Sequence, residues 1–218
     1  MKSETIRVRW TQGHKKLHFL LYFIGLLGSI WFFWYFINHW VWLGGAVILT
    51  FLYSAPKISI PPFGSLKKFA VGKTVFLAFV WTYVTSFLPI AMDNHHWDGQ
   101  SVLFCCYRFF LIYAICIPFD YRDRDHDKKE GIRSMITYLS ESGINILFYG
   151  SLFFSFVATV ALYKYQFTPT VIIFLLIPHL ILVFLYPVSR RNFSDYLYYF
   201  VLDGLMMLSS LLTLFISI

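Results

Sequence analysis

Long apolar segments are the feature of this sequence that most constrains its fold. About 20 apolar residues in a helix cross the hydrocarbon core of a bilayer, which is roughly 30 Å thick. We therefore expect an all-α, polytopic membrane helix bundle of about seven transmembrane helices, with residues 1–218 forming a single transmembrane domain. The predicted spans, of which the second is the shortest, are Leu17–Phe36, His39–Ser54, Lys73–Met92, Ser101–Phe119, Ile144–Tyr163, Thr170–Pro187 and Tyr196–Ser217.

The composition agrees with lipid as the solvent for most of the chain. Hydrophobic residues make up 58% of the sequence and charged residues only 13%, against about 25% charged residues in an ordinary soluble domain. Cys105, Cys106 and Cys116 all lie in one apolar segment. Their spacing fits no zinc or redox motif, so we expect them to be small packing residues.

Basic residues gather on one side of the predicted topology. Of the 18 Lys and Arg residues, all but Lys164 and Arg108 fall on that side. The positive-inside rule makes this side cytoplasmic, so we expect a cytoplasmic N-terminus, an outer C-terminus and a multi-pass protein of the bacterial inner membrane. The basic loops account for the net charge of +7, and nucleic acid is not an expected partner.

A cluster of carboxylates follows the fourth predicted span. If that helix continues, 100° per residue places Asp120, Asp123 and Asp127 within about 60° of one another, whereas Asp125 points elsewhere. Like charges on one stripe repel each other, and the helix macrodipole adds about 0.3–1 kcal/mol of cost for each. A divalent cation that joins the carboxylates to substrate phosphates would offset this cost, and magnesium typically binds through one or two carboxylates plus phosphate oxygens.

Basic residues follow the same carboxylates along the chain. Lys128, Lys129 and Arg133 could neutralise a polyphosphate directly. A second interpretation is a solvated cytoplasmic loop whose acids pair with the interleaved Arg and Lys residues, as charge runs usually do. The residues alone leave the metal site and the solvated loop equally open.

Two motifs give the chain a resemblance to a known family. The segment from Asp123 to Asp127, followed by Gly131 and a basic residue, resembles the second aspartate motif of the UbiA superfamily of membrane prenyltransferases. The segment Tyr53-Ser-Ala-Pro, followed by Lys67, resembles the Tyr-Ser-x-Pro segment and downstream lysine of that family. The final span, with Asp203 near its start, is similar to the last helix of the family.

The resemblance implies an activity and a cofactor. In the family, two aspartate motifs bind magnesium and the diphosphate of an isoprenoid donor, and an aromatic or other small acceptor attacks the allylic carbon. The resemblance thus implies a prenyltransferase with Mg2+ as cofactor, with the isoprenoid diphosphate, the acceptor and the lipid bilayer as partners, and with Asp123 and Asp127 as metal-binding and catalytic residues. It implies that the substrate contacts Tyr53, Ser54, Lys67, Asp120, Lys128 and Arg133.

One family motif has no counterpart in this sequence. The first aspartate motif, Asn-x-x-x-Asp-x-x-x-Asp, is absent, and alignment of Tyr-Ser-x-Pro leaves seven helices here against nine in the family, as though the first two were missing. Two classes of protein therefore stay open. One is a magnesium-dependent transferase. The other is a non-catalytic membrane protein, either a degenerate relative that binds a lipid or a partner, or a fragment of a longer enzyme.

Three further ionisable residues fall at membrane depth, where such groups commonly have a function. We expect Arg108 to extend its side chain toward the outer surface. His179 follows a proline and could bond freed backbone groups or another helix. Asp203 lies in the half of its span nearer the acidic cluster, where it could reach a cavity or bond a neighbouring helix.

Overall fold

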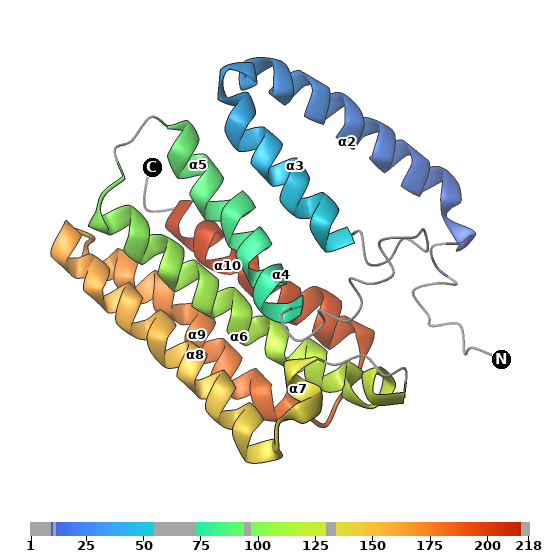
Figure 1. Ribbon diagram of the computed structural model, residues 1–218, viewed down its shortest axis with the longest axis vertical. Helices are drawn as coiled ribbons and strands as arrows, with labels where there is room; N and C mark the ends of the chain where they lie inside the picture. The colour runs from blue at the N-terminus through green and yellow to red at the C-terminus, as the bar shows by residue number, and fades with distance from the viewer. Residues whose placement is uncertain (1–9, 11, 55–72, 94–96, 130–133, 215–218) are drawn as a thin grey trace. The chain divides into compact units, whose positions relative to one another are not determined.

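The described part of the chain is helical throughout. The computed structural model describes residues 10, 12–54, 73–93, 97–129 and 134–214, and these contain no strand (Figure 1). The chain divides into two compact units, residues 1–43 and 44–218. This confirms the predicted all-α fold, whereas the single domain over residues 1–218 stays a prediction.

The first unit is built around α2, Lys15–Tyr35, which is apolar on every side. A short 3-10 turn, Ile37–His39, leads from it into α3, Trp40–Ser54, whose later part belongs to the second unit. None of the described residues of α2 is buried, and Trp34 is 78% exposed. Exposed aromatic and aliphatic side chains all round a helix indicate that it faces lipid.

The second unit is a bundle arranged around one long helix, α6 (Figure 1). Helix α6 packs most extensively against α8 and α4, and it also contacts α9 and α10. The helical segments of the unit after α3 are α4 Lys73–Thr82, a π-helical turn Tyr83–Phe87, α5 Leu88–Met92, α6 Gly99–Lys129, α7 Met135–Tyr138, α8 Glu141–Ala161, a 3-10 turn Leu162–Tyr165, α9 Pro169–Ser189, a π-helical turn Leu197–Leu202 and α10 Asp203–Leu214.

Local sequence explains where the three long helices of the bundle begin. Asp98 precedes α6 and accepts hydrogen bonds from the backbone N and the hydroxyl of Ser101, both at 2.9 Å. Ser140 accepts one from the third residue of α8, and Thr168 caps α9, whose first residue is Pro169. Capping side chains satisfy backbone N–H groups that have no partner inside the helix.

Helix α6 forms the centre of the core. Its 31 residues make it about 46 Å long. Leu111, Ile112, Ala114, Ile115 and Ile117 have no exposed surface. Apolar residues on all sides of this stretch explain why neighbouring helices surround it. The core therefore holds α6 rigidly just before the carboxylates begin.

Six helical segments are long and apolar enough to cross a membrane among the described residues, and Ile37–Tyr53 is a shorter apolar one. The chain is therefore an integral membrane protein, and the shortest predicted span, His39–Ser54, falls on this shorter apolar segment. Helix α6 continues beyond the predicted fourth span, from Phe119 to Lys129, which meets the condition set for the carboxylate stripe. Charged residues without Pro or Gly do not stop a helix.

Polar groups inside the bundle bond across helices. The Ser155 hydroxyl on α8 donates to the Tyr107 carbonyl on α6 at 2.9 Å, and it bonds His179 Nε2 on α9 at 2.7 Å. His179 thus bonds another helix, which was one of the two predicted alternatives. The predicted outward extension of Arg108 is wrong, because this residue is only 4% exposed. Its guanidinium donates instead to the Ser209 hydroxyl and the Met206 carbonyl oxygen on α10.

Candidate functional site

The candidate site lies at the end of α6, where the helix leaves the apolar core. Because α6 is continuous to Lys129, the condition for a stripe of Asp120, Asp123 and Asp127 is met. The three differ in exposure: Asp120 is partly buried, the side chain of Asp123 is 51% exposed and Asp127 is buried. Asp125, off the stripe, is exposed.

Asp120 joins α6 to two other helices. It accepts a hydrogen bond from the hydroxyl of Thr74, the second residue of α4. Lys73 at the start of α4 and Tyr53 near the end of α3 are close enough to interact with it electrostatically. Two predicted site residues, Tyr53 and Asp120, are therefore neighbours. Thr74 was not predicted, because nothing in the local sequence shows that it meets α6.

Asp123 is held by the preceding arginine. Arg122 Nε donates to Asp123 Oδ1 at 2.9 Å, and its terminal nitrogen donates to the Tyr199 hydroxyl at 3.0 Å. The guanidinium lies over the rings of Tyr198 at 4.5 Å, Tyr199 at 5.1 Å and Phe119 at 5.6 Å. Cation–π contacts with three rings fix this arginine in one place. The carboxylate of Asp123 is therefore oriented by α6 and by the π-helical turn before α10 together.

A second ionic group ties α6, α8 and α9 together at the same end. Glu141, the first residue of α8, accepts from Arg124 at 2.5 Å and also from Arg190. Arg190 also donates to Asn145 Oδ1 at 2.8 Å and lies 4.6 Å from the centre of the Tyr121 ring. The arginines interleaved with the aspartates thus pair with acids, as the loop interpretation expected, but the segment is a helix and not a loop.

The remaining predicted site residues are less well defined. Lys128 is exposed in the last turn of α6. Lys67, Arg133 and the side chain of Ser54 lie outside the described residues. Asp203, the first residue of α10, is close enough to Arg122 to interact with it electrostatically. Arg122 was the residue that sequence reasoning missed, although its position between Asp120 and Asp123 was a signal for it.

The carboxylates suit a metal ion that is shared with a substrate. Among the residues that the structure describes, no three His, Cys, Asp or Glu side chains are grouped closely enough to hold a metal by themselves. Magnesium does not require such a cage, because it commonly binds one or two carboxylates and completes its shell with water and phosphate oxygens. Asp123 and Asp127, one helical turn apart, fit this pattern.

Comparison with known proteins gives one match. The family model described as the UbiA prenyltransferase family matches residues 11–211. No curated protein and no solved structure matches the chain. The matched range covers all the described helices from α2 to the greater part of α10, and it contains the whole acidic stripe.

Proposed function

Because the chain belongs to the UbiA prenyltransferase family, we propose that it transfers a prenyl group from an isoprenoid diphosphate to a small acceptor. The observation that carries this proposal is the stripe of carboxylates at the end of a rigidly packed α6, within the region that the family model matches. The proposal treats residues 1–218 as one membrane domain of that family.

Asp123 and Asp127 are the proposed magnesium ligands. A bound magnesium ion would neutralise charge on the diphosphate and make it a better leaving group. Arg122 would keep the Asp123 carboxylate in position through the bond to Oδ1. Thr74 would hold Asp120 beside them. These two partners reduce the repulsion and the freedom of the stripe before substrate binds, which is the role of outer groups around metal ligands.

The other proposed contacts surround the diphosphate. Tyr53 interacts with Asp120 electrostatically and could donate its hydroxyl to a phosphate oxygen. Lys128 would add positive charge from the last turn of α6, and we propose the same for Lys67 and Arg133, with Ser54 as a further donor. Charge-assisted hydrogen bonds from such groups stabilise a departing diphosphate. The apolar tail of the donor would stay among lipid-facing helices, away from water.

The proposed orientation follows the charge asymmetry of the loops. It places the N-terminus and the acidic end of α6 in the cytoplasm and the C-terminus outside, in a bacterial inner membrane. A water-soluble diphosphate head and a membrane-soluble tail could then meet at the same boundary.

A second candidate function is supported by the sequence itself. The printed sequence lacks the first aspartate motif, Asn-x-x-x-Asp-x-x-x-Asp. A family member without that motif would have half of the diphosphate site, and it could bind a lipid or a partner without turnover. This non-catalytic alternative predicts that the aspartates of α6 have no role in releasing diphosphate.

The experiment that separates the two functions measures diphosphate release. The full chain is purified in detergent and given a prenyl diphosphate with and without magnesium. We expect magnesium-dependent release that Asp123→Asn and Asp127→Asn each lower by about 100-fold or more, as for metal ligands. Asp125→Asn is the matched control, because Asp125 is exposed and off the stripe. Equal release from all four proteins would leave the non-catalytic alternative.

A further inference from the structure

Arg108 carries a buried positive charge within the bundle. The residue is 4% exposed, and its guanidinium donates to Ser209 Oγ at 3.0 Å and to the Met206 carbonyl oxygen at 2.8 Å. Both acceptors are neutral. No carboxylate of the described residues forms an ion pair with Arg108. A buried charge without a counter-charge is costly, and ionisable groups at membrane depth commonly mark the path or site of a ligand.

A pocket lies at the end of the bundle opposite the acidic stripe, and Ser209, a hydrogen-bond partner of Arg108, is one of its lining residues. Its volume is about 400 Å3, which lies within the range of small-molecule sites. Phe104, near the start of α6, lines it. Sixteen residues of α6, or about 24 Å of helix, separate Phe104 from Asp120. The pocket is therefore distinct from the candidate prenyltransferase site, and an inference about it does not depend on prenyl transfer.

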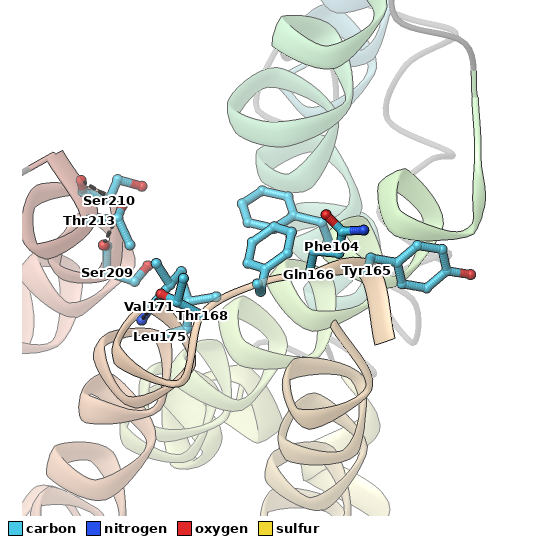
Figure 2. Close-up of a pocket in the computed structure, with 10 residues that line it drawn as sticks. Phe104, Tyr165, Gln166, Thr168, Val171, Leu175, Ser209, Ser210 and Thr213 are labelled. Atoms are coloured by element: carbon cyan, nitrogen blue, oxygen red, sulfur yellow. Dashed lines mark hydrogen bonds between the residues drawn. The ribbon is translucent and has the colours of Figure 1, made fainter. Parts of the chain in front are cut away.

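Ser209 connects the buried charge to the pocket. Its hydroxyl accepts the hydrogen bond from Arg108, and Ser209 is also a lining residue of the pocket (Figure 2). A hydroxyl that accepts a bond from a guanidinium keeps its own proton and becomes a stronger donor, because hydrogen bonds in a chain polarise one another. Ser209 is only 1% exposed, so it lies between the buried arginine and the pocket, and the positive charge of Arg108 acts on the pocket across it through a medium of low polarity.

The remaining walls of the pocket are of two kinds. Hydroxyl groups come from Ser210 on α10 and from Thr168, the cap of α9, whereas the Thr213 hydroxyl already donates to the carbonyl oxygens of Ser209 and Ser210 (Figure 2). Apolar surface comes from Phe104 and Leu175. Hydroxyls suit a phosphate or carboxylate, which accepts several hydrogen bonds, and the apolar side chains suit the first carbons of an attached chain. The walls therefore match an amphiphile with an anionic head.

We propose that this pocket binds the anionic head group of an amphiphile, phosphate or carboxylate, with Arg108 as its counter-charge through Ser209. The head would lie among the hydroxyls of α10 and α9, and the first part of the tail would lie against Phe104 of α6. A membrane lipid and a free anion share this head-group chemistry, and the test below distinguishes these two sources.

The test measures binding to the full chain in a neutral detergent by calorimetry. The probes are dihexanoyl phosphatidic acid, dihexanoyl phosphatidylcholine and inorganic phosphate. We expect the phosphatidic acid to bind and the phosphatidylcholine to bind at least about tenfold more weakly, because its phosphate is already neutralised. If inorganic phosphate binds as tightly as phosphatidic acid, the pocket is an anion site whose source is the free ion. Equal binding of the two lipids would overturn the proposal.

Two variants assign the binding to this pocket. Ser210→Leu fills the pocket from an exposed position that the core does not need, and Arg108→Gln removes the charge but keeps donors for Ser209 and Met206. Each should weaken phosphatidic acid binding by about tenfold or more. Ser151→Ala is the control, since this buried hydroxyl bonds only the Leu147 carbonyl of its own helix. Wild-type affinity in a folded Ser210→Leu protein would overturn the proposal even if Arg108→Gln did not fold.

Discussion

The two ends of α6 surround their arginines in different ways. At the acidic end, Arg122 and Arg124 each reach a carboxylate, Asp123 and Glu141, at 2.9 and 2.5 Å. Near the other end, Arg108 is more deeply buried; among the described residues it bonds a hydroxyl and a backbone carbonyl and lies 6.0 Å from the centre of the Tyr107 ring, with no carboxylate partner. The more buried arginine of this helix therefore lacks a carboxylate partner among the described residues, whereas the two less buried arginines each have one.

The difference shows what each end is built to receive. At the acidic end the residues from Asp120 to Lys129 include four Asp, two Arg and two Lys, so neighbouring cations balance the carboxylates, which would suit a cation that arrives with a diphosphate. Toward the other end the buried cation of Arg108 bonds Ser209, which lines a pocket whose polar groups are hydroxyls and the Gln166 amide. Balanced charges at one end, and a buried cation without a carboxylate partner among the described residues at the other, predict different ligands: a metal diphosphate and a simple anionic head group.

The largest expected effect comes from removing the arginine that positions Asp123 at the acidic end. Arg122→Ala removes the bond that holds Asp123 and the contact with three aromatic rings. We expect magnesium-dependent diphosphate release to fall by about 10- to 100-fold, the usual effect of losing a partner of a metal ligand, with a weaker dependence on magnesium concentration. Arg191→Ala, which removes an exposed cation after α9, is the control. An unchanged magnesium titration for Arg122→Ala would show that Asp123 needs no such support.

A second prediction compares arginines with and without a carboxylate partner. Arg108→Met replaces an unpaired buried charge with an apolar side chain of similar length, so we expect the free energy of unfolding to stay level or rise by about 1 kcal/mol. Arg190→Met removes the ion pair with Glu141, whose side chain is 54% exposed, and the hydrogen bond to Asn145. We expect this change to lower the free energy of unfolding by about 1 kcal/mol. Unfolding by SDS in mixed micelles measures both. If Arg108→Met lowered the free energy of unfolding as much as Arg190→Met, the idea that Arg108 is a costly buried charge would be wrong.

The smallest predicted effect lies between the two ends. Ser155→Ala removes the hydroxyl that joins Tyr107 of α6 to His179 of α9. Hydrogen bonds between membrane helices contribute about 0.6 kcal/mol on average, so we expect a loss near 1 kcal/mol for this doubly bonded group in the same SDS titration. Ser151→Ala, whose hydroxyl bonds its own helix, should lose less than half as much. Equal losses would mean that the cross-helix bonds add nothing.

Much of the fold could be predicted because lipid leaves the backbone few choices. A segment in the bilayer must satisfy its polar backbone groups internally, so apolar length alone located the helices, and the predicted span Lys73–Met92 coincides with the observed helical segment. Apolar length does not give the end of α6. Charges end an apolar run without ending a helix, and the sequence from Asp120 to Lys129 contains neither Pro nor Gly.

The candidate site could be predicted only where it depends on one helix. The spacing of Asp120, Asp123 and Asp127 gives their stripe directly, because helical geometry is local. Their partners come from elsewhere: Thr74 is 46 positions from Asp120, and Tyr199 is 77 from Arg122. Such contacts depend on how helices pack, which periodicity does not encode. The same limit explains the wrong prediction for Arg108, whose acceptors lie about 100 positions away.

Helix α6 is longer than the hydrocarbon core of a bilayer is thick, so roughly 15 Å of it extends past the lipid chains. Its buried middle prevents it from sliding relative to its neighbours. A thicker membrane would therefore cover more of the protruding turns and bring lipid head groups level with Asp123, whereas a thinner one would leave that carboxylate standing in water. We therefore expect the lipid composition of the host membrane to affect the acidic stripe through bilayer thickness, without any lipid binding to it.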